Sequence, residues 1–306
     1  INARNNNYVA DLLAQHLFEL RCSPKDCCNL NGSAWLNVFG NFMDNKQYFD
    51  NLSRFNGNTG GVLAGLDYCF SSGISLGGSL GYSYTNVLWK GDRGRGQINS
   101  YYGALYGSYQ CNHFAMDISA IGGGSDHDLK RKIKFSVIDR HAKSDFWAYF
   151  LTGHLGTQTN WDWGCGTFEP FALVDYNYFD RNHFKEKGAH SLNLDVKAKN
   201  QEMLRGESGL KVYYNWKVQC ICLAPYLSLS WVGEFPLGTS RQKAQFKGQT
   251  SKISVKSYHS SVQLVSPQAG IKWTSNDGFS FIFGYKGLFN RKVQINEAEA
   301  RLEWLF

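Results

Sequence analysis

The chain has 306 residues, of which 43% are hydrophobic and 19% charged, and its formal net charge is +7 at pH 7. Disorder is excluded, because enough apolar side chains are present to form a core or to face a membrane. The mean hydropathy is −0.37 and no apolar run approaches the roughly 20 residues of a helical membrane span, which excludes a helical membrane protein. With 15% aromatic residues, 32 glycines and 5 prolines, the composition favours a β-rich fold with tight turns.

Residues 1–31 carry a helical pattern that the rest of the chain lacks. Asn7 is a candidate N-cap, and apolar residues recur after it at helical spacing as far as Arg21. The apolar stripe comprises Val9, Leu12, Leu13, Leu17 and Leu20. Polar residues lie off this stripe at Asp11, Gln15 and Glu19. We therefore expect one short amphipathic helix, followed by a polar connector. Residues 1–4 show no secretory signal pattern, so we expect an exported protein to extend beyond this chain.

From residue 34 the spacing of apolar residues changes from helical to alternating. The alternation predicts twelve β-strands, at 34–43, 60–70, 74–85, 98–110, 114–123, 146–158, 168–178, 203–215, 221–234, 263–273, 279–287 and 298–306. The strand at 98–110 has tyrosines on both faces, so its phase is ambiguous. In the other strands one face is apolar and the opposite face carries polar or ionised side chains. Ionised groups are costly in a packed sandwich core but suit a wet lumen, so we predict an all-β fold, a 12-stranded antiparallel transmembrane β-barrel.

The phase of the alternation assigns particular side chains to the lumen. These residues are Trp35, Phe39, Asp67, Asp117, Glu169, Asp175, Arg205, Glu207, Lys211 and Lys272. Trp35 and Phe39 belong to the first strand and are the aromatic members of the set. They either receive the apolar stripe of the helix, at Val9, Leu13 and Leu17, or simply fill lumen space.

The segments between the predicted strands alternate between short and long. The short ones lie near 71–73, 111–113, 159–167, 216–220 and 274–278. The long ones lie at 44–59, 86–97, 124–145, 179–202, 235–262 and 288–297. Outer-membrane barrels show this alternation because their periplasmic turns are short and their outer loops are long. With an even number of strands, both ends of the barrel fall on the periplasmic side, and Phe306 is placed at that rim.

Basic residues are concentrated in the six long segments. These segments contain 23 of the 32 Lys and Arg residues, against 12 acidic residues. An excess of positive charge outside the membrane would attract lipid phosphates, lipopolysaccharide or acidic surface polymers, and salt would weaken that attraction. Lys243, Lys247, Lys252 and Lys256 are the candidates within 235–262. The alternative is that these segments are ordinary solvated loops.

Short motifs follow one another along the predicted strands. They are Trp35-Leu-Asn-Val-Phe-Gly40, Gly60-Gly61, Gly65-Leu-Asp67, Tyr101-Tyr-Gly-Ala-Leu-Tyr106, Phe168-Glu-Pro170 and a closing Phe306. Together with the helix and the twelve strands, they resemble the C-terminal translocator β-barrel domain of autotransporters, the type V secretion proteins of the Gram-negative outer membrane, over nearly the whole chain. The resemblance implies a secreted passenger polypeptide ahead of residue 1, a helix inside the barrel, and a C-terminal strand that the outer-membrane assembly machinery reads through Leu302, Trp304 and Phe306. A twelve-stranded barrel has room for one helix about 10 Å across, so residues 1–31 are expected to be pore helix and connector, and residues 32–306 the barrel.

Three short patterns resemble reactive sites. Residues 77–81 match the G-x-S-x-G nucleophile elbow, but that motif needs a strand-to-helix turn and this stretch lies within a strand. Residues 126–128, with His127 between two aspartates, could supply an acid–base pair, and a solvated loop is the alternative. Cys22 and the pair at 27–28 lack a partner pair with zinc-ligand spacing. We therefore expect no metal site and no cofactor.

Self-cleavage is a further hypothesis that the resemblance raises. In some autotransporters the passenger is released at an Asn-Asn bond in the pore, where a side-chain amide attacks its own carbonyl with help from lumenal acids. Asn5, Asn6 and Asn7 offer such bonds. The residues around them do not match the motif of that subfamily, and asparagine is common at helix starts. We therefore expect no enzyme activity, with these three asparagines as the weak candidates.

Three functions remain to be compared. The first is a translocator that anchors an N-terminal passenger and passes it to the cell surface. The second is an outer-membrane hydrolase that uses loop residues near His127, and the third is a passive porin or adhesin. The expected partners of the translocator are the lipid bilayer, lipopolysaccharide, the barrel assembly machinery and the passenger, with no nucleic acid and a monomeric state. Removing a helix that plugs the pore would raise conductance, which separates the first function from the third.

The eight cysteines are predicted to lie at or near the periplasmic rim. They are Cys22, Cys27, Cys28, Cys69, Cys111, Cys165, Cys220 and Cys222. The periplasm is oxidising, so disulfides can form there, but the sequence does not decide the pairing. One hypothesis is a bridge from the connector to a neighbouring turn, and a second is intermolecular bridges to cysteine-rich periplasmic partners. The third is that the thiols only fill space.

Overall fold

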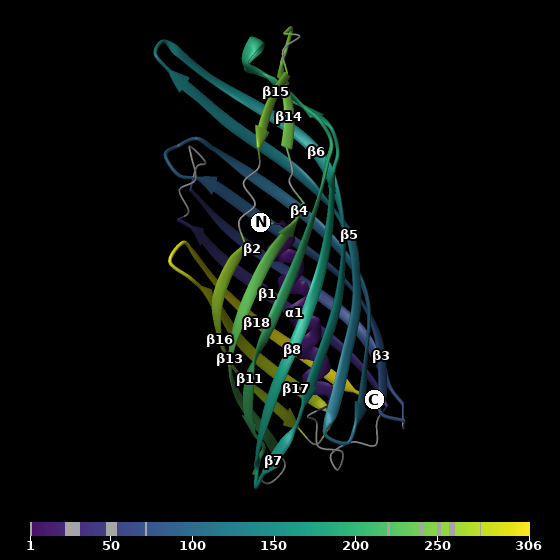
Figure 1. Cartoon of the computed structure of the whole chain (residues 1–306). Coiled ribbons are helices and arrows are strands. Elements are labelled where there is room, and N and C mark those ends of the chain that lie inside the picture. The colour runs from purple at the N-terminus through teal and green to yellow at the C-terminus, as the bar shows by residue number, and fades with distance from the viewer. Residues whose placement is uncertain are drawn as a thin grey trace.

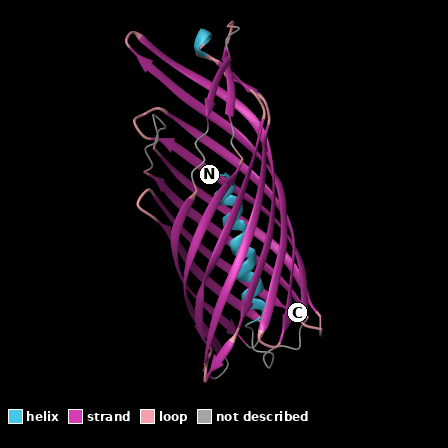
Figure 2. Ribbon diagram, viewed as in Figure 1, coloured by secondary structure: helices cyan, strands magenta, loops and turns pink. Residues whose placement is uncertain are grey.

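The computed structural model describes residues 2–21, 31–46, 54–70, 72–218, 221–238, 241–249, 252–256, 261–275 and 277–306. Twelve long antiparallel strands close into a tall barrel, and one helix runs along its interior (Figures 1 and 2). The predicted all-β, 12-stranded barrel with an N-terminal helix in its lumen is confirmed. No helix among the described residues is both long enough and apolar enough to cross a membrane.

The barrel strands are hydrogen-bonded in chain order. They are β1 (Gly32–Asn45), β2 (Phe55–Cys69), β3 (Ile74–Trp89), β4 (Gly94–Cys111), β5 (Phe114–Phe135), β6 (Ile138–Thr159), β8 (Gly166–Arg181), β11 (Lys199–Tyr214), β13 (Ile221–Leu237), β16 (Val262–Ser275), β17 (Phe279–Phe289) and β18 (Val293–Leu305). β18 pairs with β1 and closes the ring. We call the end where Phe306 lies the C-terminal rim, and the opposite end, with the longer connections, the loop end. Two short strands, β7 (Trp161–Trp163) and β12 (Trp216–Val218), lengthen hairpins at the C-terminal rim.

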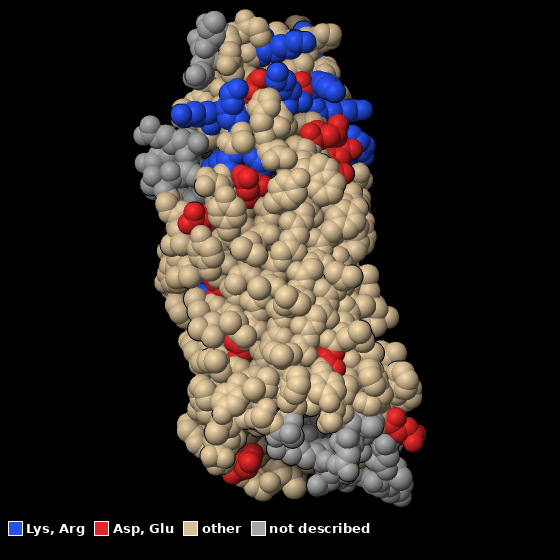
Figure 3. Space-filling view, turned by 90° about the vertical axis from the view of Figure 1, so that its right-hand side faces the viewer, with Lys and Arg blue, Asp and Glu red and all other residues tan. Residues whose placement is uncertain are grey.

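The outer face of the barrel is apolar because alternate residues of each strand point away from the lumen. Leu80, Leu105 and Leu227 are 74%, 73% and 67% exposed, although they are large aliphatic residues. The strand whose phase was ambiguous, β4, follows the same rule, since Tyr102 is buried and Tyr101 is exposed. On the face that Figure 3 shows, a broad, largely uncharged band covers the barrel, with Lys and Arg gathered above it at the loop end. Such a band suits a lipid environment.

The loop end contains more β-structure than the sequence predicts. Residues 124–145, predicted as a loop, form the outer part of a long β5–β6 hairpin that turns at Ser136, where φ is 50°. The segments at 179–202 and 235–262, also predicted as loops, contribute a second sheet, which we call the loop-end sheet. It contains β9 (Phe184–Lys185), β10 (Leu194–Val196), β14 (Arg241–Phe246) and β15 (Lys252–Lys256), with the helical turn η1 (His190–Leu192) beside it. Above the membrane, charged residues interrupt both strand faces, which removes the alternation on which the prediction depends.

The helix α1 (Asn2–Arg21) begins five residues before the predicted cap at Asn7, so that assignment is wrong. Asn7 Oδ1 accepts a hydrogen bond from Asn177 Nδ2 at 2.7 Å, and Asn5 Nδ2 donates to Thr85 Oγ1 at 2.9 Å. Asparagine disfavours a helix because its side chain competes for nearby backbone groups. Hydrogen bonds to the barrel wall remove that competition, so tertiary contacts extend the helix toward the loop end.

Two glycines of β2 let large aromatic side chains lie against the inner wall. Phe39 faces Gly61, and Trp35 faces Gly65, across the β1–β2 ladder. A Cβ atom added at Gly61 would lie 2.4 Å from Phe39 Cζ, and one at Gly65 would lie 2.5 Å from Trp35 Cζ2. The absence of a side chain gives each ring the depth it needs, and the lumen keeps room for α1.

Candidate functional site

The wall formed by β1 to β6, which we call the apolar half of the lumen, packs against the apolar stripe of α1. The buried cluster comprises Tyr8, Val9, Ala10, Leu12, Leu13 and Leu17 of the helix and Trp35, Phe39, Leu63, Tyr102, Ala104, Tyr106, Ile121 and Phe150 of the wall. Leu20 is partly buried and packs against it. Tyr8 meets Phe39 edge to face, with ring centroids 5.4 Å apart. Full burial of one aliphatic side chain contributes about 1.5–3 kcal/mol, so this stripe binds the helix strongly.

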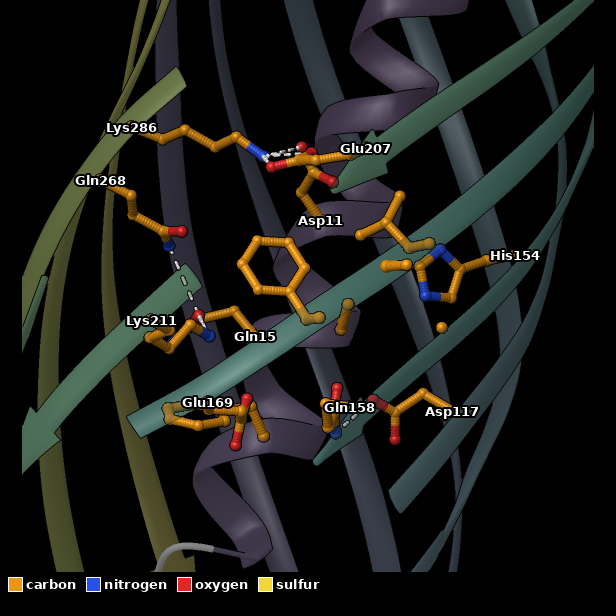
Figure 4. A pocket seen from close by; sticks show the side chains of 16 residues that line it. Asp11, Gln15, Asp117, His154, Gln158, Glu169, Glu207, Lys211, Gln268 and Lys286 are labelled. Carbon is orange, nitrogen blue, oxygen red and sulfur yellow. Dashed lines mark hydrogen bonds and ion pairs between the residues drawn. The ribbon is translucent and has the colours of Figure 1, made fainter. Parts of the chain in front are cut away.

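The wall formed by β8 to β18, the ionic half, presents charged side chains to the opposite face of α1. Asp11 accepts hydrogen bonds from Arg205 Nη1 at 2.8 Å and from Lys286 Nζ at 2.9 Å. Arg205 also donates to Asp175 Oδ2 at 2.7 Å and pairs with Glu207, which Lys286 reaches at 2.9 Å. Figure 4 shows Asp11, Glu207 and Lys286 converging beside the helix. Two cations thus join one helix carboxylate to two wall carboxylates, the kind of pairing that buried charges require.

A second group of polar contacts lies toward the C-terminal end of α1. Glu19 pairs with Arg301 of β18, and Gln15 Nε2 donates to Glu19 Oε1 at 2.6 Å. Lys272 Nζ donates to the backbone carbonyl of Glu19 at 3.2 Å and lies 3.4 Å from Glu303 Oε2. The ionic half therefore holds the helix at its middle and near its end.

Two further contacts join the helix to the wall. His16 Nε2 lies 2.7 Å from Asp67 Oδ2, which also accepts a hydrogen bond from Ser33 Oγ at 2.8 Å. Lys211 Nζ lies 3.6 Å from the centre of the Phe18 ring, a cation–π contact. The structure places all ten residues predicted to face the lumen inside the barrel, each of them buried. The helix that the resemblance implied for the lumen runs past these side chains, and charged members such as Arg205 and Lys272 pair with acids of α1 or of the wall.

The three candidate asparagines lie in the first turns of α1. Asn5 Oδ1 accepts hydrogen bonds from Asn41 Nδ2 at 3.2 Å and from Thr59 Oγ1 at 3.4 Å. Asn6 and Asn7 are buried. In the described part of the chain, the side-chain hydrogen bonds of Asn5 and Asn7 go to hydroxyl and amide groups, whereas the lumenal acid Asp67 is bound to His16. None of these hydrogen bonds of Asn5 and Asn7 among the described residues involves a carboxylate.

A small cavity of about 60 Å³ remains between α1 and the wall (Figure 4). Its lining includes Asp117, His154, Gln158 and Glu169, and Gln158 Nε2 donates to Asp117 Oδ2 at 3.2 Å. A polar cavity of this size holds a few water molecules. Across the residues that the structure describes, no cluster of three or more His, Cys, Asp or Glu side chains has a geometry for a metal ion.

The other reactive patterns lie within strands. His127 belongs to β5, is buried, stacks on Phe146 with ring centroids 4.6 Å apart and lies 2.9 Å from Ser125 Oγ. Because successive strand residues point to opposite faces, the neighbouring aspartates at 126 and 128 project away from this ring. Residues 126–128 therefore lie in a strand rather than in the solvated loop that was the alternative, and the aspartates do not face the His127 ring as an acid–base pair would require. Ser79 is a buried residue of β3, without the turn that a nucleophile elbow needs.

The last residues of the chain present aromatic side chains to the outside. Leu302, Trp304 and Phe306 are 39%, 49% and 52% exposed. Trp304 stacks on Phe279 with ring centroids 6.0 Å apart. Phe306 N donates to the carbonyl of Gly32 at 2.8 Å, which joins the final residue to the start of β1.

Four of the eight cysteines lie in the described part of the chain. Cys69 ends β2, Cys111 ends β4, Cys165 lies in the turn before β8, and Cys222 lies near the start of β13. These positions are at the C-terminal rim, and the four thiols form no disulfide among the described residues. Cys22, Cys27, Cys28 and Cys220, and with them the connector at 22–30, lie outside the described residues.

The polar face of the helix has no partner that the sequence pattern predicts. Asp11, Gln15 and Glu19 recur every four residues and therefore lie on one helix face, where they meet the ionic half. That spacing was a signal for a charged binding face. His16 gave no such signal, because a single histidine between apolar residues is compatible with ordinary packing.

Comparison with known proteins identifies the family. The autotransporter beta-domain model matches residues 34–286. An extracellular serine protease of Serratia marcescens is 24% identical over 98% of this chain, and outer membrane protein A of Rickettsia conorii is 25% identical over 74% of this chain. The chain spans only 29% and 12% of the length of these two relatives.

Solved structures share the fold. The translocator domain of the autotransporter NalP from Neisseria meningitidis has a TM-score of 0.75 at 11% identity, covering 99% of this chain and 98% of that one. The beta domain of the Bordetella autotransporter BrkA has a TM-score of 0.70 at 18% identity, covering 90% of this chain and 100% of that one. With the family model spanning most of the barrel, this chain belongs to the autotransporter family and is a translocator β-domain of a Gram-negative outer membrane.

Proposed function

We propose that this chain passes a passenger polypeptide, joined ahead of residue 1, through the barrel to the cell surface and anchors it there. The helix runs from the loop end toward the C-terminal rim, where the chain enters β1 (Figure 1). A polypeptide joined to the start of α1 is therefore directed to the loop end. In this proposal residues 1–31 serve as pore helix and connector, and residues 32–306 as the anchor. The observation that carries the proposal is that α1 fits the lumen wall on both sides. Its apolar stripe packs against the apolar half, and its polar face is bonded to the ionic half.

The same fit favours a plugged translocator over a passive porin. Two cavities beside α1 in the described part of the chain, of about 60 Å³ and about 20 Å³, have room for water molecules rather than for a stream of solutes. We therefore propose that α1 stays in the lumen after passage and closes it. An alternative hydrolase function receives no support from His127, which is buried in a strand.

Surface exposure of a reporter tests the passage. An epitope fused ahead of residue 1 should be cleaved by protease added to intact cells. The same fusion without β17 and β18 should stay protected, because an open sheet cannot span the membrane. An epitope that stays protected although the barrel is folded, as judged by its heat-modifiable migration in gels, would contradict the proposal.

Conductance tests the plug. Deleting residues 2–21 should raise single-channel conductance in planar bilayers severalfold, because a helix about 10 Å across leaves the lumen. Leu227→Ala, on the lipid-facing surface, is the control and should leave conductance unchanged. Equal conductance with and without the helix would mean that the lumen is closed by something else.

We further propose that the assembly machinery reads the outward side chains of Leu302, Trp304 and Phe306. Their position at the C-terminal rim and their exposure support this role. Phe306→Ser should reduce the amount of folded barrel in outer-membrane fractions. Phe281→Ser, an exposed position on the neighbouring β17, is the matched control. Equal reductions would point to lost lipid contact rather than recognition.

Contact with lipopolysaccharide and a monomeric state also belong to the proposal. Lys243 and Lys247 lie in or next to β14, whereas the side chains of Lys252 and Lys256 in β15 lie outside the described part. Binding of lipopolysaccharide should weaken with added salt and in a variant with all four lysines changed to Gln. If neither added salt nor the four substitutions weakens binding, this part of the proposal is wrong. Sedimentation in detergent should give the mass of a single chain.

A further inference from the structure

A cleft of about 750 Å³ opens at the loop end, between the β3–β4 turn, the outer part of β5 and the loop-end sheet. Its walls include Trp89 and Arg93 beside the turn, residues 129–135 of β5, and Phe184 of β9. We call it the rim cleft. It exists because the β3–β4 hairpin stops where Lys132 N meets Arg93 O, while β5 continues beyond that point. Its volume lies within the roughly 300–1,000 Å³ typical of ligand sites.

Positive charge dominates the lining of the rim cleft. Five basic residues line it, namely Arg93, Lys130, Arg131, Lys132 and Lys134, against the acids Asp92 and Glu186. Both acids are engaged by cations of the lining, since Arg131 Nε donates to Glu186 at 3.0 Å and Lys132 pairs with Asp92. Lys134 is exposed. On the face drawn in Figure 3, Lys and Arg side chains gather at the loop end. Lys130 Nζ also lies 3.6 Å from Asp128 Oδ2, which is outside the lining. The lining itself keeps an excess of positive charge toward an entering anion, with five basic residues against two acids.

Apolar surfaces are interleaved with these cations. Trp89 and Leu129 are half-buried, and Phe135 is 53% exposed although it is a large aromatic residue. Phe184 is held by stacking on Phe146, with ring centroids 4.5 Å apart. Flat aromatic faces pack against the C–H faces of sugar rings, while guanidinium and ammonium groups bind phosphate and sulfate. The cleft therefore offers contacts for both parts of a charged sugar.

The position of the rim cleft above the apolar band of the barrel favours a sugar as its ligand over a peptide. Tyr101 and Trp147, both exposed, stack 6.2 Å apart and mark the upper edge of the apolar band. Tyr101 pairs with Gly124, and Leu129 follows five residues later on β5, about 16 Å along a strand at 3.3 Å per residue. This is the level at which sugar head groups cover the outer leaflet of such a membrane.

We propose that the rim cleft binds an anionic saccharide, with its phosphate or sulfate groups on Arg93, Lys130 and Lys134 and its rings on Trp89 and Phe135. Two sources share this chemistry: the phosphorylated core sugars of lipopolysaccharide, and sulfated polysaccharides of another cell surface. The site goes beyond passage of a passenger, and it uses none of the lysines of β14 and β15.

Calorimetry on the full chain in detergent tests the proposal with four probes. They are a phosphorylated core oligosaccharide, the same oligosaccharide after dephosphorylation, a sulfated heparin hexasaccharide, and polyglutamate as an acidic peptide. At least one of the two anionic saccharides should bind and the other two probes should not, and the one that binds identifies the source. The proposal is overturned if neither anionic saccharide binds, or if the dephosphorylated sugar or polyglutamate binds as tightly.

Two variants locate the binding. Arg93→Gln combined with Lys134→Gln should weaken affinity by about tenfold or more, because charge-assisted hydrogen bonds are lost, and Phe135→Ala should weaken it without changing the salt dependence. Arg95→Gln, exposed and outside the lining, is the control and should bind like the wild type. If both variants bind the saccharide as tightly as the wild type, the rim cleft is not the binding site. Export of the fused reporter should stay normal in every variant, which separates this site from the translocator function.

Discussion

The apolar half and the ionic half of the lumen hold the same helix by different physical means. In the apolar half, Leu13 and Leu17 pack among rings and aliphatic groups, and such contacts have no preferred direction. In the ionic half, Asp11 is bonded to Arg205 and Lys286, and such bonds fix the rotation and height of the helix. Desolvation offsets much of the attraction between buried charges. The apolar half thus supplies most of the binding energy, and the ionic half supplies the position.

The contrast between the two halves also suits a lumen that holds water during passage and a helix afterwards. During the proposed passage of a passenger, the lumen has to contain water, which the ionic half favours. After passage it has to retain one helix, which the apolar half favours. A wall of a single type would serve only one of these states.

The largest loss of stability should follow when buried carboxylates of the ionic half lose their cation. Arg205→Met removes the cation shared by Asp11, Asp175 and Glu207. We expect the free energy of unfolding, measured by urea unfolding of the refolded barrel in detergent, to fall by about 3–5 kcal/mol. Adding Asp11→Asn should restore part of the loss, since one stranded carboxylate is removed. A loss below about 1 kcal/mol would show that water screens these charges, and the comparison between the halves would fail.

Opening a cavity in the apolar half should cost somewhat less. Leu13→Ala leaves a void in the cluster around Trp35 and Phe39, and we expect the free energy of unfolding to fall by an amount in the lower part of the range of about 2–5 kcal/mol, because no buried charge loses its partner. Leu227→Ala, which faces lipid, is the size-matched control and should change stability far less. Equal losses at the two positions would mean that the helix adds nothing to the stability of the barrel.

Adding a methyl group to the packed wall of the apolar half should lower stability by a smaller amount. An adjacent glycine provides a closely matched control. Gly61→Ala pushes against Phe39, and we expect the free energy of unfolding to fall by about 1–3 kcal/mol and the plug to leak in conductance records. The adjacent Gly60→Ala has nothing within 4 Å of its new Cβ and should be close to neutral. If both variants behave alike, backbone flexibility rather than ring packing is responsible.

The smallest effect concerns the exposed ion pairs of the loop-end sheet. The hydrogen bond with His183, 2.7 Å from Asp195 Oδ1, holds the pKa of Asp195 below its usual value of 3.8. A lowered carboxyl pKa adds stability above the unfolded pKa, and that stability is lost as the pH falls through the folded pKa. At pH 5, pepsin should therefore cut the β9–β10 region more slowly in the wild type than in Asp195→Asn. The difference should disappear as the pH falls from 3.8 through the lowered pKa of Asp195 in the folded protein. A difference that persists in acid would assign the protection to packing.

The face on which each side chain lies followed from the sequence. Lys211 and Lys272 were assigned to the lumen by alternation alone, and both are buried inside the barrel. Successive strand residues point to opposite faces whatever the sheet packs against, so the face is a local property. The helical spacing of Val9, Leu13 and Leu17 gave the buried side of α1 for the same reason.

The partners of those side chains were decided only by the tertiary structure. Arg205 and Asp11 are 194 residues apart in the chain, and nothing in their local spacing relates one to the other. The early start of α1 also depended on contacts with distant strands. Local stereochemistry sets the direction of a side chain, whereas the group it meets depends on how twelve strands close into one ring and on the stagger between them.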